Sequence, residues 1–246
     1  MTGAALTEAL LRFKGKLEGS QVLGVNMPDP AALRELPADP RARITAFSLD
    51  SALHRRAEKV ERAGDRLGAL FGLWPPPPAG GHDAAVVALP RGREYQDFLL
   101  SLVSPMIRRG APIWVVGTVR AGARSAQTLL IERIGPLTGR DAARRCFLYR
   151  LTREARRIPR PALDDWETGW MARGLGVELA VRGFPGVFSV GRLDPGTALL
   201  LSSLEGASPA GAVLDWGCGC GVVGAALMTS WHRARVTLAD SNALAV

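Results

Sequence analysis

The sequence contains one segment that is dense in glycine, Val213-Leu214-Asp215-Trp216-Gly217-Cys218-Gly219-Cys220-Gly221. It starts as a short apolar strand, turns through three glycines and continues into the apolar residues 222–227, which predict the beginning of a helix. Glycines in such a turn let the backbone approach a ligand closely. Asp240 follows Gly221 by 19 residues, at the end of the next predicted strand, where its carboxylate can accept two hydrogen bonds from a ribose diol. The segment therefore predicts a nucleoside-binding strand, turn and helix.

Two nucleoside cofactors fit this turn. Residues 219–224 satisfy the pattern G-x-G-x-x-G of dinucleotide-binding turns, which leaves an NAD-dependent oxidoreductase as one alternative. The acid at the turn, Asp215, favours S-adenosylmethionine, because that molecule carries a cationic sulfonium and an ammonium group. A carboxylate is a poor neighbour for a pyrophosphate. We therefore predict S-adenosylmethionine as the cofactor and expect Trp216 to pack beneath the turn.

The first half of the chain repeats part of this pattern. Residues 44–53 align with residues 236–244, because each is an apolar strand that ends on an acid and continues into Ser and then Ala-Leu. Further apolar runs at 84–89 and 113–117 predict two strands, and an amphipathic helix is expected between them. Pro105 lies within the apolar stripe of this helix and must kink the helix or restart it. We predict an α/β, class I methyltransferase-like (Rossmann-like) fold used twice, with a degenerate N-terminal copy and an incomplete C-terminal copy. The first copy has a turn without the glycines, so only the second copy is expected to bind the cofactor.

Composition limits the other possibilities. The 246 residues are 47% hydrophobic and 22% charged, which is typical of a folded globular protein. No run approaches 18 apolar residues and the N-terminus lacks a secretory pattern, so we expect a cytoplasmic protein with no membrane partner. Three cysteines and three scattered histidines predict reduced thiols and no metal site.

The charge balance indicates a polyanionic partner. The formal net charge is +8, and only three of the 31 basic residues are lysines. Residues 144–160 carry seven arginines against one acid, interleaved with two aromatic residues, which favours nucleic-acid contact. The alternatives are GC-rich coding, which enriches arginine without selection for binding, and a solvated connector. The predicted RNA-binding residues are Arg144, Arg145, Arg150, Arg153, Arg156 and Arg157.

Proline-rich stretches suggest the domain boundaries. Residues 74–81 form a polyproline bridge, and prolines flank the end of the arginine run at 157–161. We predict a degenerate N-terminal domain over 1–160, a connector over 161–185 and the start of a cofactor-binding domain over 186–246.

The segment Phe188-Ser-Val-Gly-Arg-Leu-Asp-Pro-Gly-Thr-Ala-Leu-Leu-Leu201, followed by the glycine turn, resembles the ribosomal RNA small-subunit methyltransferase C family. Leu89-Pro90-Arg91 and the stretch from Val115 to Ala126 are similar to the first half of that family. The resemblance covers residues 80–246. It implies S-adenosylmethionine-dependent methylation of the exocyclic N2 of a guanine in ribosomal RNA, with the small ribosomal subunit as partner and a monomer when complete.

The resemblance also assigns roles to residues. It implies a cofactor turn built from Asp215, Gly217, Gly219 and Gly221, with Asp240 on the ribose. Asp194 and Thr197 either approach the cofactor or only start the following helix. No catalytic residue is assigned, because the Asn-Pro-Pro-Phe/Tyr segment that holds the guanine in the family is not in this sequence. We therefore expect a C-terminally truncated chain that is inactive alone, and the alternative is an RNA-binding pseudoenzyme with a vestigial cofactor turn.

Overall fold

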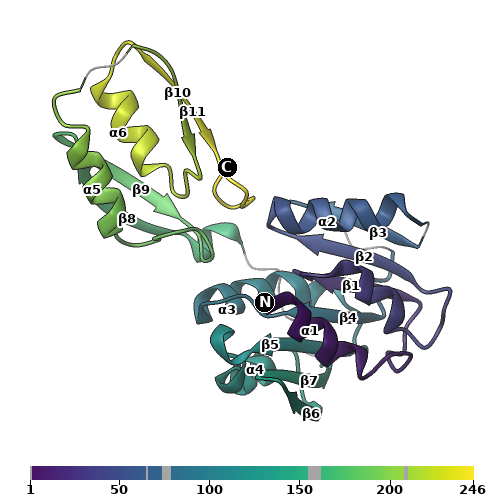
Figure 1. Cartoon of the computed structure of the whole chain (residues 1–246). Helices are drawn as coiled ribbons and strands as arrows, with labels where there is room; N and C mark the ends of the chain where they lie inside the picture. The colour runs from purple at the N-terminus through teal and green to yellow at the C-terminus, as the bar shows by residue number, and fades with distance from the viewer. Residues whose placement is uncertain (1, 65, 74–78, 155–161, 208–209) are drawn as a thin grey trace. The chain divides into compact units, whose positions relative to one another are not determined.

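A seven-stranded sheet organises the first half of the chain (Figure 1). The computed structural model describes residues 2–64, 66–73, 79–154, 162–207 and 210–246. The sheet order is β3-β2-β1-β4-β5-β7-β6, with β1 to β5 parallel and β6 and β7 antiparallel to their neighbours. The strands are β1 (Gln21–Val25), β2 (Arg43–Ser48), β3 (Leu67–Phe71), β4 (Ala84–Ala88), β5 (Pro112–Thr118), β6 (Leu137–Ala143) and β7 (Cys146–Thr152).

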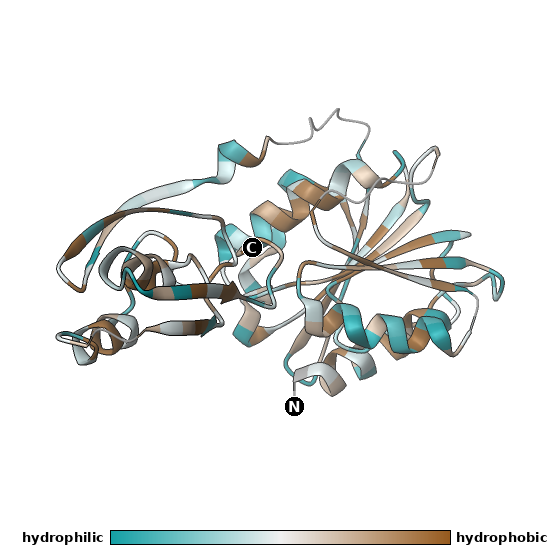
Figure 2. Ribbon diagram, turned by 90° about the horizontal axis from the view of Figure 1, so that it is seen from above, coloured by the Kyte–Doolittle hydropathy of each residue, from teal (hydrophilic) through white to brown (hydrophobic). Residues whose placement is uncertain are grey.

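Helices cover both faces of this sheet (Figure 2). One face carries α1 (Thr2–Leu11), α2 (Ser51–Arg62) and the 3-10 turn η1 (Pro30–Glu35), and α3 (Arg93–Val103) and α4 (Gln127–Arg133) lie together on the other. The remaining short turns of this part are η2 (Ser104–Met106), η3 (Val119–Ala121) and η4 (Ala123–Ser125). All five residues of β4 are buried, because a strand covered on both faces is apolar throughout.

The predicted strand, helix and strand over residues 84–117 are confirmed. β4 and β5 pair in parallel, and α3 connects them. Pro105 acts as expected, since α3 ends at Val103 and η2 restarts the chain with proline in its first turn. Phe98, Leu99 and Leu102 are almost completely buried on the inner side of α3.

The chain divides into two units, Met1–Pro161 and Ala162–Val246. The second unit contains η5 (Leu163–Trp166), β8 (Thr168–Gly174), β9 (Val177–Gly183), α5 (Pro195–Ser203), β10 (Gly211–Trp216), α6 (Val222–Ser230) and β11 (Ala234–Ala239). β10 and β11 pair in parallel, as the glycine-rich segment predicts. The connections differ between the two units. The helix α6 connects β10 to β11 in the second unit, whereas only the short turn η1 lies between β1 and β2 in the first. The use of one fold twice is therefore not confirmed.

The predicted connector is an ordered part of the second unit. Its residues form the antiparallel hairpin of β8 and β9. Ala172 and Val181 of the hairpin are buried against Leu201 of α5 and against Val222 and Ala226 of α6. Apolar and polar residues alternate along β9, so one face of the hairpin is available for burial. The connector therefore contributes to the core of the second unit.

The hairpin of β6 and β7 turns through Arg144 and Arg145, whose φ angles are +49° and +63°. A two-residue turn with both φ values positive favours Asn-Gly, because a Cβ comes too close to the following carbonyl oxygen there, glycine has no Cβ and asparagine tolerates this conformation best. We expect the double change Arg144→Asn and Arg145→Gly to raise the free energy of unfolding of this unit by about 1–2 kcal/mol. Urea denaturation followed by circular dichroism measures this change. An unchanged or lower unfolding midpoint would contradict it.

Candidate functional site

A cavity of about 190 Å³ lies beside the glycine-rich turn of the second unit. Three segments line it: the loop around Phe188, the first turn of α5, and the turn from Asp215 to Cys220 with the start of α6. The predicted cofactor residues found in its wall are Asp194, Thr197, Asp215, Gly217 and Gly219. The fold therefore brings together residues that are up to 25 positions apart in the sequence.

Positive φ angles explain the glycines of the turn. Gly217 has φ +81° and Gly221 has φ +75°, a region that residues with a side chain rarely adopt. No heavy atom lies within 4 Å of the position that a Cβ on Gly217 would take. The backbone N–H groups of Gly217 and Cys218 donate to the carbonyl oxygen of Ala239, at 2.7 and 3.0 Å, and fix the turn to the end of β11. The turn thus presents open space beside a rigid backbone.

Asp215 connects the turn to the helix that follows it. Its Oδ2 accepts a hydrogen bond of 3.0 Å from the backbone N–H of Gly224, in the first turn of α6. A Cβ on Gly224 would lie 3.2 Å from that oxygen and would overlap the Leu238 side chain, so the glycine permits this close contact. The carboxylate also lines the cavity. Asp215 therefore places a negative charge in the cavity wall while it holds the helix start.

Asp240 reaches the same turn from β11. Its Oδ2 accepts from the N–H of Gly219 at 2.9 Å, and its Oδ1 accepts from the N–H of Asn242 at 2.8 Å. Asn242 in turn donates from Nδ2 to the carbonyl oxygen of Gly186, at 2.8 Å. Asp240 and Gly221 do not line the cavity itself. Sequence reasoning missed Asn242, although an Asn two residues after an acid is a signal for this kind of local turn.

Asp194 starts α5, as one of the two predicted roles requires, and it also lies in the cavity wall. It is the N-cap of α5, and its Oδ2 accepts from the N–H groups of Gly196 and Thr197 at 2.8 and 3.2 Å. Asp194 and Thr197 also line the cavity. Capping uses one carboxylate oxygen, so it leaves acceptor capacity on the other.

The position of Trp216 differs from the prediction. Its side chain is 83% exposed and lines the cavity, rather than packing beneath the turn. The reason is the alternation of β10, in which Asp215 and Trp216 point to opposite faces. Phe188, 67% exposed, lines the cavity from the preceding loop and was not singled out by sequence reasoning.

The two cysteines of the turn remain protonated thiols. Burial, together with the neighbouring Cys218 and Asp240, raises the pKa of Cys220 to about 11. Burial, with Asp240 and Asp215, also raises the pKa of Cys218. Both thiols therefore lack the thiolate character of reactive cysteines.

This gives a chemical prediction. At pH 8, Cys220 is expected to react with a maleimide at least about a hundredfold more slowly than free cysteine, whose pKa is about 8.5, and Cys218 is also expected to react more slowly than free cysteine. The rate is expected to rise as the pH approaches the Cys220 pKa of about 11, because the thiolate then forms. Mass spectrometry of peptides after timed labelling measures each site. Labelling within tenfold of the free amino acid, as an approximate limit, would contradict a raised pKa.

Among the described residues, the predicted RNA-binding arginines have different surroundings. Arg144 and Arg145 lie at the tip of the β6–β7 hairpin, and the guanidinium of Arg150 lies 5.1 Å from the ring centre of Phe13. Arg153 is only 5% exposed and donates from Nε to the carbonyl oxygen of Ser104 at 2.9 Å, so it is a structural residue and not a surface contact. Arg156 and Arg157 lie outside the described residues.

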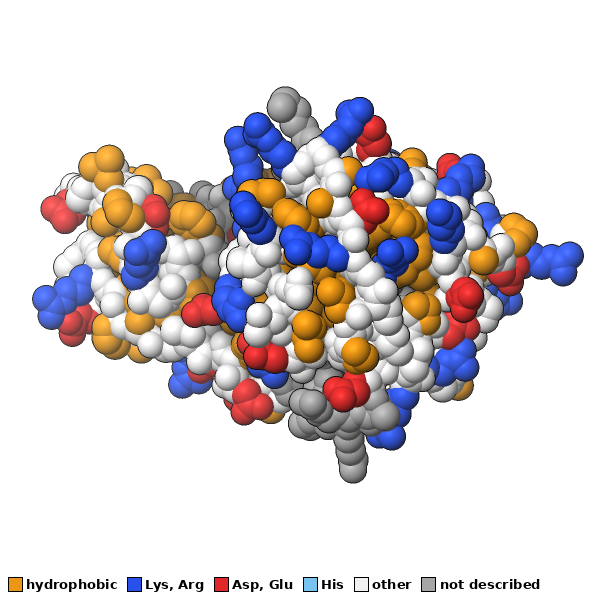
Figure 3. Space-filling view, turned by 90° about the horizontal axis from the view of Figure 1, so that it is seen from below, with side chains coloured by type: hydrophobic (Ala, Val, Ile, Leu, Met, Phe, Trp, Pro, Cys, Tyr) orange, Lys and Arg blue, Asp and Glu red, His pale blue; other side chains and the backbone are white. Residues whose placement is uncertain are grey.

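Another arginine of this hairpin, Arg140, lies over its two aromatic rings, of which Tyr149 is fully buried. Arg140 lies over the rings of Phe147 and Tyr149, at 4.9 and 5.7 Å from their centres, and these two rings are stacked at 6.2 Å. In the view from below, Lys and Arg side chains gather around hydrophobic ones (Figure 3). Sequence reasoning missed Arg140, because it precedes the dense arginine run and joins it only through strand pairing.

Within the residues that the structure describes, no group of three or more His, Cys, Asp or Glu side chains could hold a metal ion. Among the helices of that same part, none is long and apolar enough to span a bilayer.

Comparison with known proteins identifies the family. The family model for the N-terminal part of the methyltransferase small domain matches residues 7–169, and the model for the methyltransferase small domain matches residues 178–246. Ribosomal RNA small subunit methyltransferase C of Hahella chejuensis is 34% identical over 98% of this chain and 68% of the relative. The same enzyme of Photobacterium profundum is 38% identical over 100% of this chain and 70% of the relative.

A solved structure shows the same fold. The 16S rRNA N2 methyltransferase RsmC of T. thermophilus, in complex with AdoMet and guanosine, matches with a TM-score of 0.77 and 24% identity. The match covers 98% of this chain and 63% of that chain. This chain thus spans about two thirds of the length of the proteins it matches. The predicted α/β, class I methyltransferase-like fold is confirmed by this match. The chain belongs to the ribosomal RNA small-subunit methyltransferase C family.

Proposed function

We propose that this chain binds S-adenosylmethionine at the glycine-rich turn and serves the methylation of a guanine N2 in ribosomal RNA of the small subunit. The observation that carries the proposal is the cavity beside the turn, where the Asp215 carboxylate and the open backbone at Gly217 lie together. A ligand with a positive charge and a ribose fits this set of groups better than a pyrophosphate does.

Named residues would hold each part of the cofactor. Asp215 would attract the ammonium group, and the backbone at Gly217 and Gly219 would allow close approach. Asp240 would accept from the ribose diol, because each carboxylate oxygen has two lone pairs and uses one of them for a backbone N–H. When bound, S-adenosylmethionine supplies an electrophilic methyl group whose sulfur leaves as a neutral thioether. The described residues of this chain bind and orient the donor, and none is assigned to hold the guanine.

Calorimetric titration with S-adenosylhomocysteine tests this proposal directly. We expect saturable binding at one site per chain, and we expect binding to weaken strongly when Asp215 is replaced by alanine. A chain that binds RNA and gives no saturable heat with S-adenosylhomocysteine would overturn the cofactor proposal. That result would favour the RNA-binding pseudoenzyme.

We propose that the β6–β7 hairpin contacts RNA phosphates. Two arginines at the hairpin tip, Arg144 and Arg145, support this proposal together with Arg140 on β6. In the variant Arg144→Asn and Arg145→Gly, two charges are removed while the turn keeps a suitable sequence. The slope of log affinity against log salt for a ribosomal RNA fragment is expected to fall by about 1–2.

The matched control removes two arginines elsewhere in the same unit. Arg55→Ala and Arg62→Ala change the net charge equally, on the exposed side of α2. This control is expected to leave the slope within about 0.5 of the parent chain. Equal slopes for the two double variants would contradict a role for the hairpin.

A further inference from the structure

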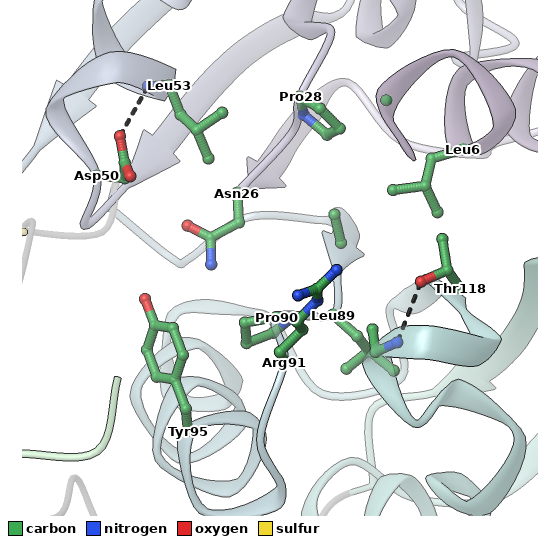
Figure 4. A pocket seen from close by; sticks show the side chains of 13 residues that line it. Leu6, Asn26, Pro28, Asp50, Leu53, Leu89, Pro90, Arg91, Tyr95 and Thr118 are labelled. Carbon is green, nitrogen blue, oxygen red and sulfur yellow. Dashed lines mark hydrogen bonds between the residues drawn. The ribbon is translucent and has the colours of Figure 1, made fainter. Parts of the chain in front are cut away.

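The first unit contains a larger cavity, of about 390 Å³, that the methyl-donor site does not use (Figure 4). It lies at the carboxyl ends of β1, β4 and β5, with the start of α2 and part of α1 in its wall. In the sheet order β3-β2-β1-β4-β5, the direction of winding reverses between β1 and β4. Ligands of open α/β sheets bind outside the carboxyl ends of the strands at such a reversal. Its volume falls within the range of about 300–1,000 Å³ for small-molecule sites.

Three polar side chains meet in one corner of this cavity. Asn26 follows β1, Asp50 follows β2, and Tyr95 comes from the first turn of α3 (Figure 4). Asp50 is the N-cap of α2, and its Oδ1 accepts from the N–H groups of Ala52 and Leu53, at 2.7 and 3.2 Å. Neither capping bond uses Oδ2. The carboxylate therefore keeps acceptor capacity for a pair of hydroxyl groups.

Tyr95 adds a donor to the same corner. Its hydroxyl hydrogen-bonds the Asn26 side chain, and burial together with the Asp50 charge raises the pKa of Tyr95 to about 12. The hydroxyl therefore stays protonated at neutral pH. The Ser48 hydroxyl donates to Oδ1 of Asn26 at 3.3 Å, which orients the amide. The corner is a rigid set of oxygen and nitrogen atoms of known donor and acceptor character.

The other walls are apolar and carry one positive charge. Leu6 of α1, Pro28 and Leu89 supply flat hydrophobic surface. Arg91 lines the cavity and is exposed, so its guanidinium remains accessible to an anion. A guanidinium presents a fork of donors that matches phosphate oxygens. The Asp50 carboxylate, the apolar wall and the Arg91 guanidinium therefore surround the same cavity.

A second molecule of the methyl donor does not fit this arrangement. The turn after β1 contains Pro28 and Pro30, which lack backbone N–H groups, where the turn of the second unit is rich in glycine. A Cβ on Gly24 would overlap the Leu33 side chain, so this backbone is already covered. The cationic end of the donor would also lie near Arg91. The guanidinium of Arg91 favours a ligand with an anionic group on that side of the cavity.

We infer that this cavity binds one ribonucleoside 5′-phosphate, either free or as an unpaired nucleotide of an RNA strand. The Asp50 carboxylate accepts from the ribose diol, the apolar wall contacts the base, and Arg91 binds the phosphate. The assignment uses only residues of the first unit, so it is independent of the cofactor site. It gives the glycine-poor half of the chain a binding function of its own.

Calorimetry on the full chain, saturated with S-adenosylhomocysteine, tests the inference with the four ribonucleoside 5′-monophosphates. At least one is expected to bind saturably, and its 2′-deoxy form and its nucleoside are each expected to bind about tenfold more weakly, because each lacks a hydrogen bond to a charged side chain. A short single-stranded oligoribonucleotide that binds more tightly than the monophosphate would identify RNA as the source. A monophosphate that binds more tightly than the strand would identify the free nucleotide.

Matched variants locate the site. Arg91→Ala and Asp50→Ser are each expected to weaken binding at least about tenfold, and serine retains the capping function at position 50. Arg93→Ala removes an equally exposed charge that does not line the cavity, and it is expected to change affinity less than about twofold. Asp215→Ala and the parent chain, both measured without S-adenosylhomocysteine, are expected to bind the nucleotide with the same affinity.

Several outcomes would overturn the inference. One is the absence of saturable binding, and another is equal affinity of the Arg91 and Arg93 variants. Loss of nucleotide binding in Asp215→Ala would place the nucleotide in the second unit instead. Nucleotide binding by a chain that does not bind S-adenosylhomocysteine would leave this inference standing and would overturn only the cofactor proposal.

Discussion

Replacement of Asp215 by alanine is expected to weaken S-adenosylhomocysteine binding by at least about a hundredfold, or about 3 kcal/mol. Two effects act in the same direction. The cavity loses the carboxylate that attracts the ammonium group, and the N–H of Gly224 loses its acceptor at 3.0 Å, which loosens the start of α6. Asp215→Asn keeps an acceptor oxygen for Gly224 and removes only the charge. It is expected to weaken binding about tenfold.

Glu205→Ala provides the control for this series. Glu205 is exposed after the end of α5 and does not line the cavity, so its removal changes the charge of the second unit equally. Its affinity for S-adenosylhomocysteine is expected to stay within about twofold of the parent chain. Isothermal titration calorimetry compares all four proteins. If Asp215→Ala binds as tightly as Glu205→Ala, the cofactor does not contact the turn as proposed.

Gly135→Ala is expected to lower the free energy of unfolding of the first unit by about 3 kcal/mol or more. Gly135 has φ +143°, and a Cβ there would overlap the carbonyl oxygen of Thr152 and lie 2.9 Å from the backbone nitrogen of Glu154. Those backbone atoms cannot easily move. The N–H of Thr152 donates to Pro136 at 3.1 Å, and the N–H of Glu154 donates to Ile134 at 2.9 Å.

Gly110→Ala separates steric overlap from backbone strain. Gly110 also has a positive φ, of +79°, but no heavy atom lies within 4 Å of a Cβ at this position. The expected loss is therefore only about 1–2 kcal/mol, which is the cost of the left-handed conformation. Urea denaturation of both variants gives the comparison. Equal losses would show that the contact with β7 adds nothing to the strain.

Local sequence patterns predicted those elements of the fold whose conformation depends on residues close together in the sequence. The glycines of 217–221 allow only a tight turn, so β10, the turn and α6 follow from the sequence. The apolar run of β4 and the stripe of α3 gave the strand and helix for the same reason. The hairpin of residues 168–183 was missed, although its alternation is visible, because prolines before it favoured a connector.

The arginines illustrate what a local pattern cannot decide. Arg150 and Arg153 belong to one dense run in the sequence, yet one lies over the ring of Phe13 and the other is buried against the carbonyl oxygen of Ser104. Burial lowers the pKa of Arg153, and the charge of Arg109 lowers it further, which is the opposite of a free surface cation. Ser104 is 49 positions from Arg153, and Phe13 is still farther from Arg150 along the chain. Charge density along the chain therefore did not predict charge density on a surface.

The sequence by itself determined the family and the glycine-rich turn between β10 and α6, because glycine conformation and strand periodicity act over a few residues. Only the tertiary structure decided which side chains share a cavity. Asn26, Asp50, Arg91 and Thr118 are separated by up to 92 positions and meet because four parallel strands end at one edge of the sheet. Trp216 is exposed because the alternation of β10 directs it away from the core. Such contacts depend on strand order and register, which are set by the packing of the whole sheet.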